Sequence, residues 1–185
     1  MRRISLLLAL LVLALGIAAA PRHLASRVTI GGDFVHFESG HVRPAVMTPD
    51  GTRLLVVNTP DNRLTVFSLT DTIPIKIAEI PVGVEPVSVA ALDNGTAWVV
   101  NHLSDAVSVV DLTTMHVRAT VRVGDEPQDV VFAGSPTRAY VSVSTLDAIK
   151  VYDPASLALV STIPVNGRMP RALARNADGT LVFAS

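Results

Sequence analysis

The sequence predicts an all-β fold, a β-propeller of four-stranded antiparallel blades with about three and a half blades present and the ring incomplete. The first observation is a corner that runs from a glycine to a proline and recurs at residues 40–44, 83–86, 124–127 and 167–170. The prolines are about 42 residues apart, a period typical of one propeller blade per repeat. The second observation is that short apolar runs separated by turn residues follow each corner.

The repeats place the blades at about residues 44–82, 86–123 and 127–165, with a partial blade at 170–185. In the first blade, Pro49-Asp50-Gly51 is a turn sequence, because proline presets φ and glycine tolerates a positive φ. A largely alternating pattern of apolar and polar residues over 64–69 predicts a half-buried strand. The expected strands are residues 45–48, 53–58, 64–69, 75–82, 87–92, 97–101, 106–111, 117–123, 129–132, 139–143, 148–153 and 159–165.

The N-terminus is predicted to be a targeting segment. Arg2 and Arg3 precede an apolar run that closes on Ala18-Ala19-Ala20, which is typical of a secretory signal peptide over residues 1–20. An uncleaved N-terminal anchor is the alternative, and the arginine pair is too close to the initiator methionine for a twin-arginine signal. A leader over residues 21–33 then precedes the propeller of residues 34–185, and we expect an extracytoplasmic, periplasmic or secreted protein.

Composition excludes several classes of function. The chain has no cysteine, so it holds no disulfide, no lipoprotein anchor and no covalently attached c-type haem of its own. Its net charge is −1 with both signs scattered along the chain, so no basic stripe is available for nucleic acid. We therefore expect no nucleic-acid partner, no membrane span once the signal is cleaved, and no cofactor.

Two strands carry a family resemblance. Leu55-Val56-Val57-Asn58 and Trp98-Val99-Val100-Asn101, each followed by a valine-rich strand, resemble the YVTN repeat over residues 34–185. The resemblance implies a propeller like the surface-layer and periplasmic (YncE-like) members. Families with this repeat also include propellers grouped with lactonases and the haem d1 domains of nitrite reductases. This chain departs from the repeat at Val143, which stands where Asn101 does, and at Ser68, which stands where other copies have aspartate.

Both ends of the repeat array predict a piece of a longer propeller. The last expected strand is cut at Ser185, and residues 35–38 hold the place of an outer strand that would complete the last blade of a closed ring. An open stack leaves an apolar blade face and unpaired strand edges in water. We therefore expect self-association through the open blade edges.

The candidate site residues lie mainly at the corners. In a strand, His36 and Glu38 would point to one face, and His41 lies beyond the turn, so these three residues are a candidate metal site. The alternative is that they are polar residues of an exposed edge strand and its corner. Glu85 and Glu126 hold equivalent corner positions, so they would lie on one rim of the propeller. The remaining ligand-binding candidates are Arg43 at its own corner, Gln128 and Arg171 just after their prolines, and His102, which we expect to be a solvated loop residue near Asp105.

No catalytic triad, carboxylate pair or phosphate loop is legible in the sequence. The most direct interpretation is an exported binding or scaffold module for an unknown small molecule or protein, without catalysis of its own. The alternative is enzymatic. The chain would then be the propeller part of an oxidoreductase with a haem (cytochrome) domain, for which His102 is an axial-ligand candidate, or a propeller lactonase.

Overall fold

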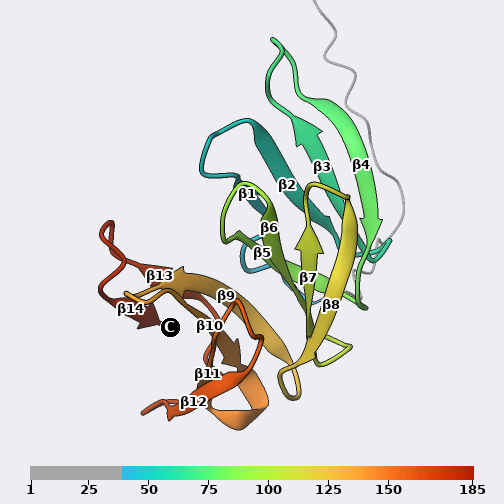
Figure 1. Cartoon of the computed structure of the whole chain (residues 1–185). Coiled ribbons are helices and arrows are strands. Elements are labelled where there is room, and N and C mark those ends of the chain that lie inside the picture. The colour runs from blue at the N-terminus through green and yellow to red at the C-terminus, as the bar shows by residue number, and fades with distance from the viewer. Residues whose placement is uncertain (1–38) are drawn as a thin grey trace, which may run out of the picture. The chain divides into compact units, whose positions relative to one another are not determined.

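The computed structural model describes residues 39–185, which form part of one compact unit, and consists almost entirely of β-strands (Figure 1). The first blade holds β1 (Ala45–Met47), β2 (Arg53–Asn58), β3 (Arg63–Ser68) and β4 (Ile75–Pro81). The second holds β5 (Pro86–Ala91), β6 (Thr96–Asn101), β7 (Ala106–Asp111) and β8 (His116–Arg122). The third holds β9 (Pro127–Ala133), β10 (Arg138–Val143), β11 (Ala148–Tyr152) and β12 (Leu159–Pro164), and a two-stranded sheet of β13 (Leu173–Arg175) and β14 (Val182–Ala184) follows.

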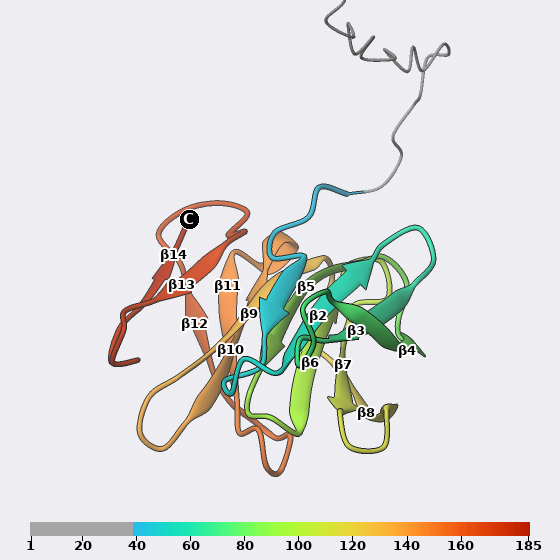
Figure 2. The same cartoon turned by 90° about the horizontal axis from the view of Figure 1, so that it is seen from above.

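Each blade is an antiparallel meander whose strands pair in chain order. The pairing of β2 with β3 runs without a shift from Arg53 opposite Ser68 to Asn58 opposite Arg63. The innermost strands bring the blades together, since β5 contacts β2 and β9, and β9 in turn contacts β13. Figure 2 shows the four sheets succeeding one another in chain order, and the predicted fold class is confirmed as three full blades and part of a fourth, without a closed ring.

The predicted strands match the observed ones to within one or two residues, and those at 53–58 and 106–111 coincide. The short 3-10 helix η1 (Ser144–Leu146) was not predicted, and it fills the polar turn after β10. It begins where Val143 replaces the asparagine of the preceding repeat.

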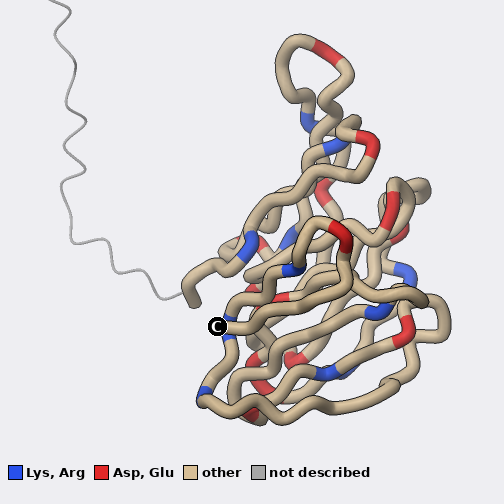
Figure 3. Tube along the Cα trace, turned by 90° about the vertical axis from the view of Figure 1, so that its left-hand side faces the viewer, with Lys and Arg blue, Asp and Glu red and all other residues tan. Residues whose placement is uncertain are grey.

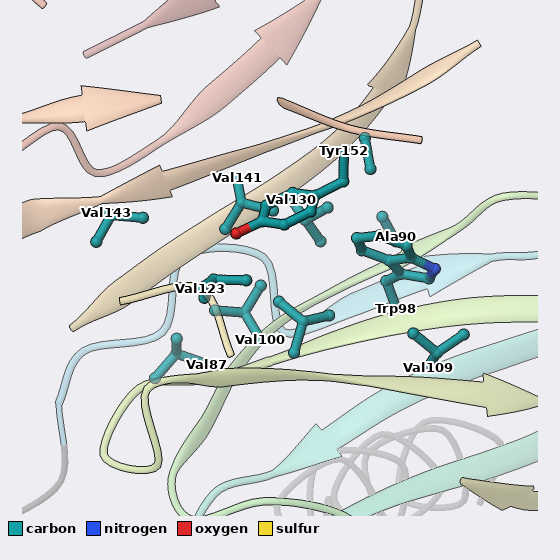
Figure 4. Close-up of a cluster of buried hydrophobic side chains, with 12 residues drawn as sticks. Val87, Ala90, Trp98, Val100, Val109, Val123, Val130, Val141, Val143 and Tyr152 are labelled. Carbon is teal, nitrogen blue, oxygen red and sulfur yellow. The ribbon is translucent and has the colours of Figure 1, made fainter. Parts of the chain in front are cut away.

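Packing between the second and third blades forms the largest apolar core (Figure 4). Trp98 is fully buried there, in an edge-to-face contact with Phe132 at 5.6 Å and a tilted contact with Tyr152 at 6.3 Å between ring centroids. Burial raises the pKa of the Tyr152 phenol above its ordinary value. A second cluster around Leu55, Leu64 and Val99 joins the first blade to the second.

The corners are fixed by a hydrogen bond that recurs in each blade. A turn residue with a positive φ, Asn or Asp, accepts the backbone N–H of a corner residue that also has a positive φ. The three pairs, turn residue first, are Asn62 with Glu85 at 2.8 Å, Asp105 with Glu126 at 3.3 Å, and Asp147 with Met169 at 2.7 Å. The backbone of the corner is therefore held by the preceding blade, while its side chain is free to vary.

Several sequence predictions fall on other parts of the chain or concern its surface. The signal peptide, the leader and the metal candidates His36 and Glu38 lie outside the described residues. Within residues 39–185, no helix has the length and apolar character needed to cross a membrane. Lys, Arg, Asp and Glu are interspersed along the trace (Figure 3), which agrees with the scattered charge seen in the sequence.

Candidate functional site

The innermost strands of successive blades contact one another and line an open channel, since the blades form no closed ring. The segment before β1 pairs in parallel with β5, through a bridge between Arg43 and Ser88, so inner strands of successive blades run in the same direction. Near the far ends of these strands lies an open cavity of about 500 Å³, within the range of small-molecule sites. Met47, Ala91 and Phe132 contribute to its apolar wall, and Arg175 and Asp178 place charges on its lining.

Arg43 also lines this cavity, and its guanidinium meets a fully buried carboxylate. Arg43 Nη2 lies 3.1 Å from Asp129 Oδ2 and also donates to the Leu173 carbonyl. Asp129 accepts three further hydrogen bonds, from Ser88 Oγ at 2.5 Å and from the backbone N–H groups of Val130 and Leu173 at 2.8 Å. One carboxylate thereby joins the segment before β1 to β5, β9 and β13, so its charge is compensated from several blades.

Sequence reasoning missed Asp129 as a site residue. The available signal was a charge at the start of an otherwise apolar inner strand, where the equivalent residue of the second blade is Ser88. A buried charge needs partners from distant parts of the chain, and its pairing with Arg43 spans 86 positions. That pairing could not be read from local spacing.

We call residues 39–43 the corner segment. It contacts each of the described sheets or the turns that follow their strands. Two of the predicted site residues lie within it, and two others bind its backbone. Glu85 Oε1 accepts the Ser39 N–H at 3.0 Å, and Arg171 Nη2 donates to the Gly40 carbonyl at 2.6 Å. His41 Nε2 lies 2.6 Å from the Thr59 hydroxyl. The structure therefore brings His41, Arg43, Glu85 and Arg171 together around one stretch of backbone.

His102 is not a solvated loop residue, because only 6% of its surface is exposed. Its backbone N–H donates to the Glu85 carbonyl at 2.9 Å, which extends the pairing of β5 with β6 by one residue. Its ring Nδ1 lies 3.3 Å from both the Pro127 carbonyl and Gln128 Nε2, so the ring packs against the third blade. The expectation of a solvated side chain fails because the turn after β6 faces the next blade.

Three buried oxygens near these residues have no hydrogen-bond partner within residues 39–185. They are Glu85 Oε2, Asn101 Oδ1 and Gln128 Oε1, on side chains that are 7%, 0% and 8% exposed. A buried acceptor without a donor is costly, and it marks a place where a ligand or water can contribute. Glu126, by contrast, is half-buried and does not join this group, although its backbone N–H is held as that of Glu85 is.

No group of three or more His, Cys, Asp or Glu side chains suited to a metal ion occurs within residues 39–185. Of the three residues of the candidate metal site, only His41 lies within the described residues, and its Nε2 is hydrogen-bonded to the Thr59 hydroxyl. His102 directs Nδ1 toward a carbonyl, an arrangement in which Nε2 would be available to a ligand. The haem hypothesis for His102 stays a prediction.

Comparison with protein families identifies the relationship that the blades suggest. The family model described as lactonase, 7-bladed β-propeller, matches residues 19–185. The chain belongs to this family of seven-bladed lactonase-type propellers. No curated protein matches it.

Two solved structures share the architecture. A chain of Kuenenia stuttgartiensis hydrazine synthase superposes with a TM-score of 0.70 at 26% identity, over 83% of this chain and 44% of that one. Citrobacter koseri AztD superposes with a TM-score of 0.56 at 17% identity, over 68% of this chain and 35% of that one, and shows likeness of fold alone. This chain therefore spans less than half the length of either protein.

Proposed function

We propose that this chain is an exported binding module that holds a small molecule in the channel cavity and performs no catalysis of its own. The observation that carries the proposal is the open cavity of about 500 Å³ beside the inner strands, which is lined by both apolar and charged side chains. Membership of a propeller family supports the scaffold role, because rigid blades present variable loops around a channel. Export and YVTN-type repeats are part of the proposal and rest on the sequence alone.

The lining favours a ligand with an apolar body and a carboxylate. Met47 and Phe132 provide apolar contact, and the exposed Arg175 offers a guanidinium that suits a carboxylate. Arg43 is already paired with Asp129, so Arg175 is the cation more available to a ligand. Asp178, on the same lining, disfavours ligands with several negative charges.

The family description favours a second candidate function, the hydrolysis of a lactone. Opening a lactone by water gives a hydroxy acid, a product with the carboxylate that Arg175 would bind. A general base is also needed, and Asp178 is the carboxylate that lines the same cavity. This candidate rests on the family and on one carboxylate, so binding without turnover remains the main proposal.

One experiment with a matched pair of probes tests both candidates. The full chain is titrated with δ-decalactone and with its ring-opened hydroxy acid, and binding is followed by calorimetry while turnover is followed by proton release. We expect the hydroxy acid to bind and the lactone not to be hydrolysed. Arg175→Ala should weaken hydroxy-acid binding about tenfold, because it removes a charge-assisted hydrogen bond of about 1.4 kcal/mol.

The control is Arg118→Ala, since Arg118 is an exposed arginine on the outer strand β8 and does not line the cavity. This variant should bind the hydroxy acid as the unmodified chain does. Equal losses in both variants would show general electrostatic attraction in place of a cavity site. Lactone turnover that Asp178→Asn abolishes would support the enzymatic candidate, and no binding of either probe would overturn the proposed ligand class.

A further inference from the structure

The corner segment is held in the way that proteins hold an extended peptide. Val42 N–H donates to the Val87 carbonyl at 3.0 Å, and Val89 N–H donates to the Arg43 carbonyl at 3.0 Å. These bonds, with the parallel bridge between Arg43 and Ser88, add two residues of chain to the inner edge of β5. Addition of a strand to an exposed sheet edge is a general mode of peptide recognition.

Side chains of opposite charge clamp the backbone ahead of this pairing. The Glu85 carboxylate accepts the Ser39 N–H, and the Arg171 guanidinium donates to the Gly40 carbonyl. Both contacts are made to main-chain groups, so they would hold an extended segment of other sequence equally well. The clamp therefore supplies affinity, and specificity must come from the side chains that follow.

Two positions of the corner segment carry that specificity. A Cβ atom on Gly40 would lie 2.7 Å from Arg171 Nη2, the end of a flexible and exposed side chain, so a larger residue here would displace the guanidinium from the Gly40 carbonyl. Three residues later, Arg43 inserts its guanidinium beside the fully buried Asp129. The preferred segment thus has a glycine followed at the third position by an arginine.

The corner segment does not provide a hydrogen-bond partner for every polar group of this site. Glu85 uses one oxygen for Ser39, and its other oxygen is buried without a partner within residues 39–185. A segment that donates to both oxygens would gain a hydrogen bond that the chain's own residues do not make. The present occupant can therefore be displaced by a better one.

We propose that the corner end of the channel is a binding site for an extended polypeptide segment of the form Gly-x-x-Arg, and that residues 39–43 of this chain occupy it as a built-in competitor. A partner segment of the same form pairs with the edge of β5 and places its arginine beside Asp129. Arg43 also lines the cavity around Arg175, but this proposal rests on the pairing with β5 and on Asp129, so it does not depend on the proposed small molecule.

A labelled synthetic peptide with the sequence of residues 39–46 tests the site in the full chain. Gly40→Val in the chain should weaken the hold on its own segment, because the new side chain displaces the Arg171 guanidinium from the carbonyl of residue 40. The peptide should then bind the Gly40→Val chain at least tenfold more tightly than the unmodified chain, since a tethered competitor acts at a high effective concentration. Adding Arg171→Ala to the Gly40→Val chain should weaken peptide binding about tenfold.

Two controls separate this result from non-specific attraction. Adding Arg168→Ala to the Gly40→Val chain should leave peptide binding unchanged, because Arg168 is an exposed arginine at the same corner and the Gly40 carbonyl is held by Arg171. A peptide with valine in place of the glycine should bind poorly. Failure of the glycine peptide to bind the Gly40→Val chain, or equal binding of the two peptides, would overturn the proposal.

Hydrogen exchange gives a second readout that does not need the peptide. The amides of Ser39 and Val42 should be protected in the unmodified chain and should exchange faster in the Gly40→Val chain, while β5 to β8 remain protected. Loss of protection throughout the second blade would instead show that the substitution unfolds it. The peptide would then be tested on the Arg43→Ala chain, which withdraws the built-in arginine from Asp129, keeps Arg171, and should bind the peptide more tightly than the unmodified chain. Rapid exchange of the corner segment in the unmodified chain would overturn its role as a built-in occupant.

Discussion

Asp129 joins more of the chain than its position in the sequence suggests. The side chain is fully buried on β9, and it accepts hydrogen bonds from the segment before β1, from β5 and from β13. Burial of a carboxylate is tolerated here because a guanidinium and several donors surround it. Loss of this side chain leaves Arg43 half-buried without its counter-charge.

We expect Asp129→Ala to lower the free energy of unfolding by about 3–5 kcal/mol, the range for removing one partner of a buried ion pair. Asp129→Asn should cost less, because an amide keeps one oxygen acceptor for Ser88 or Leu173. Urea unfolding followed by tryptophan fluorescence measures both, since Trp98 is buried between the second and third blades. If Asp129→Ala lowers the free energy of unfolding by less than about 1 kcal/mol, the Arg43 guanidinium becomes hydrated at little energetic cost when its partner is removed.

The residue scale is also where sequence reasoning reached its limit. The corner positions of Glu85 and Glu126 were predictable because they recur in phase with the proline period. The burial of His102 and the role of Asp129 were not, because each depends on contacts made by a neighbouring blade. Repeats predict where a residue lies within a blade, whereas contacts between blades determine its surroundings.

At the scale of the strand, a side chain at the end of the third strand of each full blade, or directly after it, caps the following turn. Asp111 accepts the N–H groups of Thr113 and Thr114, and Asp153 accepts those of Ala155 and Ser156. These hydrogen bonds lower the pKa of both carboxyls below the ordinary value of 3.8. Ser68 holds the equivalent place in the first blade, where its hydroxyl accepts only one backbone N–H, that of Thr70 at 3.4 Å, and lies 2.8 Å from the Thr70 hydroxyl.

A lowered pKa in the folded state means that the ionised carboxylate stabilises the fold. That stabilisation is complete above about pH 4 and is lost as the pH falls through the lower pKa of the folded state. We therefore expect the melting temperature to drop as the pH is lowered from 5 to 3. The double variant Asp111→Asn, Asp153→Asn should drop less over this range, because an amide caps the turn without titrating.

Thermal unfolding followed by circular dichroism at closely spaced pH values measures the difference between the variants. Asp71→Asn is the control, because Asp71 is exposed in the loop before β4 and caps no third strand. It should follow the pH profile of the unmodified chain. Identical profiles for the double variant and the unmodified chain would contradict the assignment.

For the whole described unit, stability comes from stacking, because each blade covers its neighbour. The core around Trp98 and the core around Leu55 each lie between two blades, and Leu173 of the partial blade packs on Val131 and Ile149. The period in the sequence predicted this stacking and the strand positions. The period could not predict how much of each outer strand is buried, because that burial depends on which strands of a neighbouring blade pack against it.

The third blade shows the least covered face. β12 is an edge strand whose residues are all exposed, and Leu159, Val160 and Ile163 are each about half exposed, at 51%, 53% and 46%. Beside it lies a cavity of about 330 Å³ lined mainly by apolar side chains, including Ile149, Ile163 and Val182. An apolar edge of this kind favours pairing with another chain.

We expect residues 21–185 to self-associate at micromolar concentration, and Leu159→Lys with Ile163→Glu to suppress the association. The new charges would have to be desolvated when the strands pair, so the dissociation constant of the self-association should rise at least tenfold. Sedimentation velocity over a concentration series measures the effect. The control is Ile73→Glu, at a residue that is 69% exposed in the loop before β4, and it should leave the association unchanged. Equal suppression by the control would place the contact on the first blade, and a monomer at every concentration would show that the edge of β12 does not pair.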